Sequence, residues 1–231
     1  MRVAASSQEL RYALRSWCTN LPHRQVWLVG HRPHWASSEV GHIPTVQDGS
    51  KWENTTTAMR AACEHPDVSD TFVWCNDDTF TMRPFLDGMP VLHRGLLRDI
   101  VARRAGRPGY GGRDEYGAGL GAALARLEGL GYGEALCYEH HSPLPVGKAA
   151  MVEALDVGAG LDVAKRSVYG NLAGLGGEFA EDVKIAWRRP QGFGPDSALV
   201  STMPDAFANG HVGRWIRSSF PKPCTYEKRG H

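Results

Sequence analysis

The chain has 231 residues, of which 42% are hydrophobic and 22% are charged, and its formal net charge at pH 7 is +1. This length and composition are typical of a globular chain with a sizeable core, so we expect a single α/β domain over residues 1–231. The small net charge excludes a whole-chain electrostatic attraction to nucleic acid or to a membrane surface.

The five cysteines are scattered, without the paired spacing of zinc or redox motifs. Reduced thiols fit this pattern, so we expect a cytoplasmic protein. No apolar run approaches the ~20 residues that cross a bilayer, and the N-terminus lacks the apolar core of a signal peptide. We therefore expect no membrane span.

The first third of the chain alternates helix and strand patterns. Apolar residues at helical spacing predict a helix over 7–19, and the β-rich run Gln25–Gly30 predicts a strand. Asn54 is a suitable N-cap for a second helix that ends near His65, and Thr71–Cys75 predicts the next strand. This β-α-β order favours a mainly parallel central sheet flanked by helices.

The middle of the chain is less regular. Pro90–Ala105 has helical periodicity. Residues 106–133 are rich in glycine, with a helical stretch near Leu120–Leu130, and we interpret them as a mobile insertion or an active-site lid. The remaining predicted elements are strands at 134–140, 182–187 and 198–202 and helices at 146–156, 161–172 and 211–220.

The most informative segment follows the strand at Thr71–Cys75, where the chain reaches Asn76, Asp77 and Asp78. Adjacent acids repel each other, and a divalent cation such as Mg²⁺ or Mn²⁺ relieves this repulsion by taking hard oxygen ligands. In an open α/β sheet, ligands bind beyond the carboxyl ends of the strands, so a metal there can also neutralise a nucleotide diphosphate. The alternative is a polar turn after a buried strand, since Asn and Asp are common turn residues.

Several segments together carry a family resemblance. They are Glu9–Ser16 (ELRYALRS), Val26–Val29 (VWLV), Asn76–Asp78, His141–Pro143 (HSP) and Phe220–Glu227 (FPKPCTYE). In this order, which spans most of residues 8–228, they resemble the second, third and fourth conserved regions of the Stealth family, the capsular-polysaccharide and N-acetylglucosamine-1-phosphate transferases. Arg166 matches an arginine further along the third region.

The chain also departs from the family pattern. The family's first region, a strand with an aspartate near a Thr-Trp-Val segment that contributes to the nucleotide site, has no match before Ser6. The glycine-rich middle has no counterpart in the family, and Cys224 stands where the family has serine.

The resemblance implies roles for the matched residues. Asp77 and Asp78 would hold Mg²⁺ or Mn²⁺ directly or through water, with Asp78 also serving catalysis, and Asn76 would shape the turn and help bind substrate. An imidazole near neutrality can accept a proton from an acceptor or attack phosphorus. Of the adjacent His140 and His141, the resemblance aligns His141 with this catalytic role.

Three arginines are expected to bind phosphate. Arg166 offers a planar donor fork suited to phosphate oxygens. Arg11 and Arg15 lie four residues apart, so they share a helix face and can address the same anion. The alternatives are a surface ion pair for Arg166 and solvation of the helix face for the other two.

We therefore predict an α/β transferase whose metal chemistry resembles that of GT-A glycosyltransferases. The donor is a nucleotide sugar, and a sugar 1-phosphate moves to the hydroxyl of an acceptor, which can be a glycan, a protein, a small molecule or a nucleic acid. One alternative is a GT-A-type glycosyltransferase that moves the sugar itself. The other is a non-catalytic carbohydrate- or nucleotide-binding module.

Overall fold

The computed structural model describes residues 7–105, 114–189, 194 and 196–228. The first elements are α1 (Gln8–Asn20), β1 (Trp27–Val29), β2 (Gly41–Ile43), α2 (Lys51–Glu64), β3 (Thr71–Trp74), β4 (Thr79–Thr81), β5 (Leu92–His93), α3 (Leu97–Arg104) and α4 (Glu115–Gly129). They are followed by β6 (Leu144–Gly147), α5 (Lys148–Val157), η1 (Asp162–Ala164), α6 (Lys165–Leu172), β7 (Glu178–Phe179), β8 (Lys184–Ile185), β9 (Leu199–Thr202), α7 (Pro204–Asn209) and α8 (His211–Ser219). Within these ranges, no helix has the length and apolarity needed to cross a membrane.

The strands of the described residues form four small sheets. β1 pairs with β2 and β5 with β7, both in parallel, whereas β3 pairs with β6 antiparallel. In the only three-stranded sheet among them, β9 lies between antiparallel β4 and parallel β8. Helices and small sheets agree with an α/β fold, but the described strands do not form the predicted central parallel sheet. Their apolar runs are too short, since β1 ends at Gly30, whose φ is 103°, and β3 ends at the polar turn after Trp74.

Helix α2 begins before the predicted N-cap. Ser50 caps it, because the Ser50 hydroxyl accepts a hydrogen bond from the Glu53 backbone N–H while the Glu53 carboxylate accepts one from the Ser50 N–H. This reciprocal pair is a capping box. Asn54, which the sequence predicts as the cap, lies inside the helix and donates from its side chain to the Gly49 carbonyl.

The predicted strand at 134–140 is a loop with a single bridge between Leu136 and Leu96. Its backbone groups bond alternately to the backbone of residues 94–97, through Ala135 and Cys137, and to side chains of α6, through Leu136 and Tyr138. Asn171 accepts from the Leu136 N–H and donates to the Leu136 carbonyl, and the Ser167 hydroxyl accepts from the Tyr138 N–H. The strand forms later, as β6, where the sequence predicts the start of a helix. The predicted helix at 90–105 is likewise shortened, because β5 occupies its first part.

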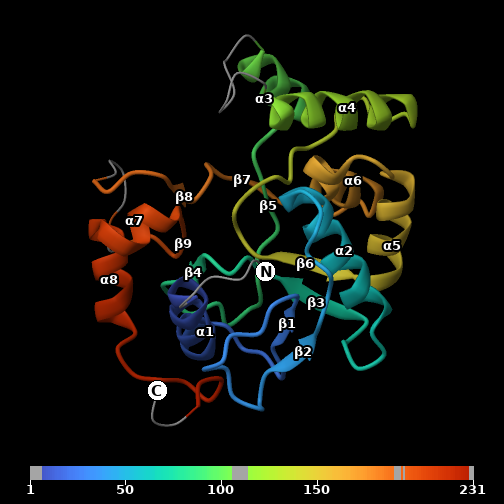
Figure 1. The fold of residues 1–231 in the computed structure, drawn as a ribbon. Helices are drawn as coiled ribbons and strands as arrows, with labels where there is room; N and C mark the ends of the chain where they lie inside the picture. The colour runs from blue at the N-terminus through green and yellow to red at the C-terminus, as the bar shows by residue number, and fades with distance from the viewer. Residues whose placement is uncertain (1–6, 106–113, 190–193, 195, 229–231) are drawn as a thin grey trace.

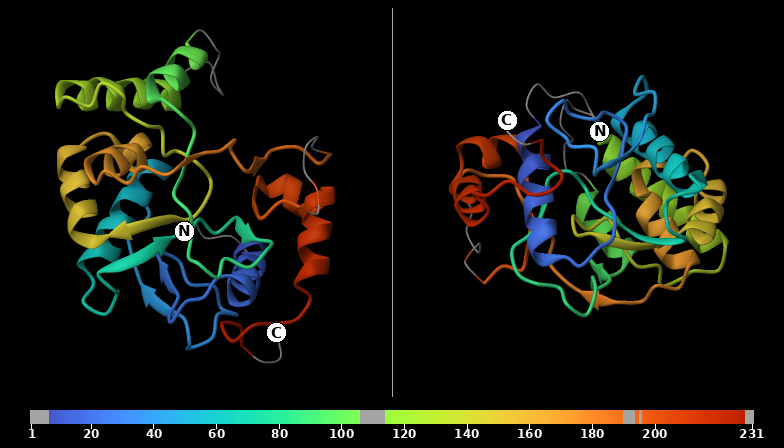
Figure 2. Two further views of the ribbon diagram at one scale, coloured as in Figure 1. Left: turned by 180° about the vertical axis from the view of Figure 1, so that it is seen from behind. Right: turned by 90° about the horizontal axis from the view of Figure 1, so that it is seen from below.

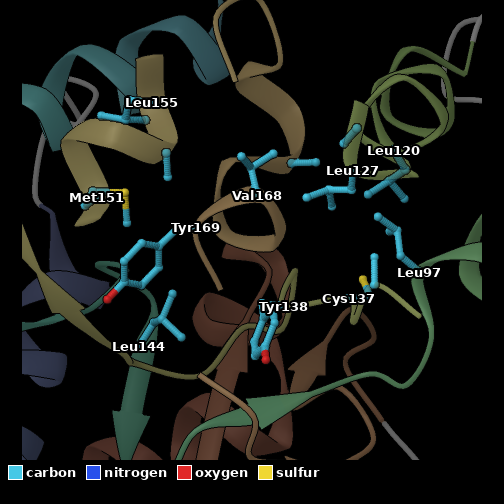
Figure 3. Packing of buried hydrophobic residues seen from close by; sticks show 14 of the residues in the cluster. Leu97, Leu120, Leu127, Cys137, Tyr138, Leu144, Met151, Leu155, Val168 and Tyr169 are labelled. Carbon is cyan, nitrogen blue, oxygen red and sulfur yellow. The ribbon is translucent and has the colours of Figure 1, made fainter. Parts of the chain in front are cut away.

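Helix α4 lies inside the glycine-rich stretch that we interpreted as a lid. It extends the predicted helical stretch towards the N-terminus, and Leu120, Ala123 and Leu127 have no exposed surface. Figure 3 shows Leu120 and Leu127 beside Leu97 of α3 and Val168 of α6. Residues 106–113 of the predicted lid lie outside the described residues. The helix itself is part of a packed core.

Two hydrophobic clusters organise the structure. The first cluster joins α2, α3, α4, α5, α6 and β6, and the second joins α1, β1, β4, β9, α7, α8 and the C-terminal segment. Accordingly, α2, α5 and α6 lie on one side of the molecule and α7 and α8 on the other (Figures 1 and 2). The chain crosses between the clusters directly after β3, where Trp74 packs against the first cluster and Cys75 against the second. It crosses again between Leu175 and Ile185.

If α4 is a packed element, its buried leucines must contribute to stability. Replacing Leu127 by alanine removes fully buried methyl groups, so we expect the free energy of unfolding to fall by about 2–5 kcal/mol in urea denaturation. Leu130 at the end of the same helix is 48% exposed and serves as the matched control, with an expected change within about 0.5 kcal/mol. Equal small effects of Leu127→Ala and Leu130→Ala would contradict the packed assignment.

Candidate functional site

Asn76, Asp77 and Asp78, which we call the acidic turn, connect β3 to β4. The turn is closed by a hydrogen bond of 3.3 Å from the Thr79 N–H to the Asn76 carbonyl. Both carboxylate oxygens of Asp78 have partners, since Oδ2 accepts from Lys184 Nζ at 2.5 Å and Oδ1 accepts from the Ser201 hydroxyl at 2.9 Å. Asp78 is therefore anchored to the sheet formed by β4, β9 and β8.

A third carboxyl group, that of Glu9 in the first turn of α1, lies near the acidic turn. The pKa of Glu9 is raised to about 7, mainly by burial, and the charges of Asp78 and Asp77 add to the rise. The hydrogen bond that Glu9 accepts from Thr202 Oγ1 at 3.0 Å acts in the opposite direction but does not outweigh burial. Asp77 is open to solvent on one side but surrounded by protein atoms at longer range. This partial loss of solvent, with the charge of Asp78, raises the pKa of Asp77.

The acidic turn and Glu9 contribute three carboxyl groups, and one nearby cation, Lys184, acts on all three. Of these, it pairs directly with Asp78. Such an excess of carboxylates fits a divalent cation. Asp77 is available to ligate it, whereas Asp78 must bind through water or give up Lys184. Among the described residues, no three His, Cys, Asp or Glu side chains are already grouped as metal ligands.

His141 and Asp182 form the second part of the candidate site. His141 Nδ1 lies 3.0 and 2.9 Å from the two carboxylate oxygens of Asp182, and the His141 backbone N–H donates to the same carboxylate. Burial acts to raise the pKa of Asp182, but the hydrogen bonds and charge of His141 and the charge of Arg94 outweigh it and hold this pKa well below its ordinary value. Asp182 is therefore ionised, so Nδ1 carries the proton that it donates. In the neutral form of this imidazole, Nε2 is then the nitrogen without a proton, and the side chain is 37% exposed.

The neighbouring His140 has a different environment. It is 1% exposed, its Nε2 bonds to the Glu181 carbonyl, and its Nδ1 accepts from the Ser142 N–H. Burial lowers its pKa, so this imidazole is neutral and both of its nitrogens are satisfied by backbone. Of the two histidines, only His141 has a side chain that is partly exposed to solvent.

One short extended segment brings His141 and Asp78 to the same place. Asp182 and Lys184 are two residues apart, so their side chains point to the same side of the segment. Asp182 holds His141, and Lys184 holds Asp78. A hydrogen bond of 3.3 Å from Thr79 Oγ1 to the His141 carbonyl adds a direct link between the two parts.

Arg166 lies beneath this site. It is 6% exposed, its guanidinium stacks 5.1 Å from the Trp74 ring, and its Nη2 donates to the Ser142 carbonyl at 2.5 Å. Burial lowers its pKa, and its buried Nε has no hydrogen-bond partner in the described structure. These contacts favour a role in positioning the loop of His141 over the direct phosphate contact that the sequence predicts.

Arg11 and Arg15 share a helix face as predicted, but both face Glu227. Arg15 makes a bidentate pair with it, at 2.6 Å from Nε and 2.7 Å from Nη2, while Arg11 Nε lies 3.4 Å away and its guanidinium stacks on Trp35. The Glu227 carboxylate thus takes hydrogen bonds of Arg15 that a phosphate would otherwise accept, whereas Arg11 contributes an ion pair without a hydrogen bond from Nε. The structure does not bring these two arginines together with His141 as substrate-binding groups.

Sequence reasoning missed three charged residues of the site, namely Glu9, Asp182 and Lys184. For the last two, a signal existed. In the predicted strand 182–187, Asp182 and Lys184 alternate with Val183 and Ile185, a pattern that places two charges on one face of a strand. Nothing local in the sequence distinguishes Glu9 from an acid that stabilises the first turn of a helix.

The chain matches no family model and no curated protein.

The raised pKa of Glu9 gives a pH-dependent prediction. The folded state binds this proton more tightly than the unfolded state, so the ionisation of Glu9 destabilises the fold as pH rises from about 4.5 to about 7. Glu9→Gln keeps an oxygen that can accept from Thr202 but removes the charge. We expect the variant to be more stable than wild type at pH 8 and equally stable at pH 4 in urea unfolding.

The matched control for Glu9→Gln is Glu128→Gln, which changes an exposed residue of α4. The difference in stability between this variant and wild type should not depend on pH. A Glu9→Gln variant that is less stable than wild type at pH 8 would show that Glu9 is ionised and stabilising there.

Proposed function

We propose that this chain is a metal-dependent transferase that uses a nucleotide sugar as donor and moves the sugar 1-phosphate to an acceptor hydroxyl. In this proposal its donor site resembles that of GT-A enzymes in its metal chemistry. The observation that supports it is that a histidine held by an aspartate lies in a loop bonded to Thr79, the residue that follows the two adjacent carboxylates after β3.

The histidine and its aspartate supply the base. Asp182 accepts a hydrogen bond from His141 Nδ1 and fixes the orientation of the ring, which leaves Nε2 to take the proton of the acceptor hydroxyl as its oxygen attacks. Asp182 also stabilises the imidazolium that results, by its negative charge. Arg166 holds the Ser142 carbonyl next to His141, so it keeps this loop in place.

The acidic turn would hold the metal. Asp77 would ligate Mg²⁺ or Mn²⁺ directly, and Asp78 would do so through water or after release of Lys184. When bound, such an ion neutralises phosphate charge in a displacement at phosphorus. Asn76 keeps the turn closed through its backbone carbonyl, so that Asp77 faces solvent.

A second candidate is a non-catalytic module that binds a carbohydrate or a nucleotide. Lys184 favours it, because an ammonium on Asp78 can neutralise the acidic turn without any metal. Glu227 favours it as well, because it occupies the two arginines of α1. Such a module binds its ligand without turnover, so consumption of the donor separates the two candidates.

The base assignment predicts a specific loss of rate. His141→Ala should lower turnover by about 10²–10⁴-fold with little change in donor affinity, because loss of a general base slows proton transfer without removing a binding group. Asp182→Asn should give a smaller loss in the same direction. Steady-state kinetics and donor titration on each variant measure both quantities.

His211→Ala is the matched control for the base, since this histidine is exposed at the start of α8. It should retain wild-type turnover. His140→Ala should reduce stability, because this side chain is buried, yet it should retain turnover per folded molecule. The assignment is wrong if folded His140→Ala is inactive and His141→Ala is active.

The nucleotide that leaves reports which bond breaks. Attack on the β-phosphorus of a UDP-sugar releases UMP, whereas attack on the anomeric carbon releases UDP. We expect acceptor-dependent UMP when the chain is incubated with UDP- or GDP-sugars, Mg²⁺ or Mn²⁺ and a cell extract as acceptor, with GMP in place of UMP for GDP donors. Chromatography of the nucleotides measures this, and Asp77→Asn should lose the metal-dependent part of the release.

Each other outcome of that experiment identifies an alternative. UDP without UMP means transfer of the sugar itself. Donor binding without consumption, measured by calorimetry, means the non-catalytic module. CMP-linked sugars are the donor control, because they contain no β-phosphorus and cannot support transfer of a sugar phosphate.

A further inference from the structure

A surface pocket with a volume of about 570 Å³ lies where the C-terminal end of α1 meets residues 222–226. We call it the thiol pocket, because two cysteines line it together with Arg15, His23 and Tyr226. Cys18 is exposed, Cys224 is half-buried, and both are free thiols. The pocket lies outside the candidate site, and nothing in the transfer reaction uses it.

The two thiols line the same pocket and differ in exposure. The neighbouring groups Cys224, His23 and Thr225, led by Cys224, lower the pKa of Cys18 to about 5. The proximity of Cys18 raises the pKa of Cys224. His23 is oriented by bonds from Nδ1 to the Leu21 carbonyl at 2.6 Å and from Nε2 to the Tyr226 hydroxyl at 2.9 Å. Cys18 is therefore both the more exposed and the more acidic of the two thiols.

The other three cysteines lack this environment. Burial raises the pKa of Cys63 to about 11, that of Cys75 to about 12 and that of Cys137 to about 11. The thiolate is the reactive form of cysteine, so these thiols are poor nucleophiles at neutral pH. Only the thiol pocket combines, among the described residues, a thiolate, a second thiol and access from solvent.

We propose that Cys18 and Cys224 are a peroxide-reactive pair, with Cys18 as the attacking thiolate and Cys224 as the resolving thiol. The Cys18 sulfur attacks one oxygen of a hydroperoxide, the O–O bond breaks, and the leaving oxygen takes a proton from water or solvent as an alcohol or water. Cys18 is now a sulfenic acid. Oxidation removes the Cys18 thiolate, which is the main cause of the raised pKa of Cys224. The Cys224 sulfur then attacks the Cys18 sulfur, the S–O bond breaks, and water leaves with the thiol proton.

The surrounding contacts hold the two sulfurs in place for this reaction. The Cys224 N–H donates to Glu227 Oε1 at 3.1 Å, and the same carboxylate makes the bidentate pair with Arg15 of α1. The C-terminal segment is thus bound to α1 before any disulfide forms. The disulfide would add a covalent link between Cys18, near the end of α1, and Cys224 of the C-terminal segment, beside this ion pair.

Oxidation of the full wild-type chain tests the proposal. The chain is treated with one equivalent of hydrogen peroxide at neutral pH, free thiols are blocked with iodoacetamide, and a non-reducing digest is mapped by mass spectrometry. We expect a peptide pair joined through Cys18 and Cys224 and the loss of two thiols from the five of the chain. On a non-reducing denaturing gel the oxidised chain should migrate faster, because the link closes most of the sequence into a loop.

Two variants separate the roles of the cysteines. Cys224→Ser should let dimedone trap Cys18 as sulfenic acid, with no internal disulfide, and Cys18→Ser should leave Cys224 unoxidised. Cys75→Ser is the control and should still form the disulfide. The proposal is overturned if wild type forms no Cys18–Cys224 link, or if Cys18→Ser leaves Cys224 as readily oxidised as before. The wild-type mapping decides the question even where a variant does not fold.

Discussion

The ion pairs of Asp182 and Lys184 connect the two halves of the structure at the candidate site. The segment that contains them crosses from the first hydrophobic cluster to the second, and it holds His141 with one charge and Asp78 with the other. Hydrophobic packing within each cluster is non-directional and does not fix one cluster against the other to the precision that a reactive site needs. The directional bonds of Asp182 and Lys184 supply that precision. The pairing of β8 with β9 holds the segment that contains them.

The charge balance around Lys184 decides what the acidic turn can do. One ammonium acts on the carboxyl groups of Glu9, Asp77 and Asp78. Burial is the main cause of the raised pKa values of Glu9 and Asp77, and the charges of the neighbouring carboxylates add to the rise. Without a further cation, protonation of the more buried carboxyl groups is the way to reduce the repulsion. A divalent ion offers a second way. In the proposed metal site, proton uptake and metal uptake would therefore compete, and the raised pKa of Glu9 would make this competition depend on pH.

The sequence predicts the elements that local patterns determine, and it fails where distant side chains decide. Helix α1 and strand β9 follow from periodicity and appear within a residue or two of the predicted ranges. Residues 134–140 have strand composition, yet Asn171 and Ser167, far away in the chain, bond to the backbone of Leu136 and Tyr138. The acidic turn and His141 stand out as residue types, whereas the partners that give them their properties, Asp182 and Lys184, are defined only by the fold.

The segments that carry the family resemblance are not all parts of one reactive site. ELRYALRS and FPKPCTYE meet through Arg15 and Glu227, a buried pair that joins the first helix to the C-terminal segment. Removing one partner of such a pair leaves a charge unpaired in the interior, so both ends of the pair are constrained by stability alone. The resemblance in these two segments is thus accounted for by packing. Asn76–Asp78 and His141–Pro143 differ, because the site's reactive groups lie there and the fold brings them together across two clusters. The proposed transfer chemistry therefore depends on these two segments and not on the arginines of α1.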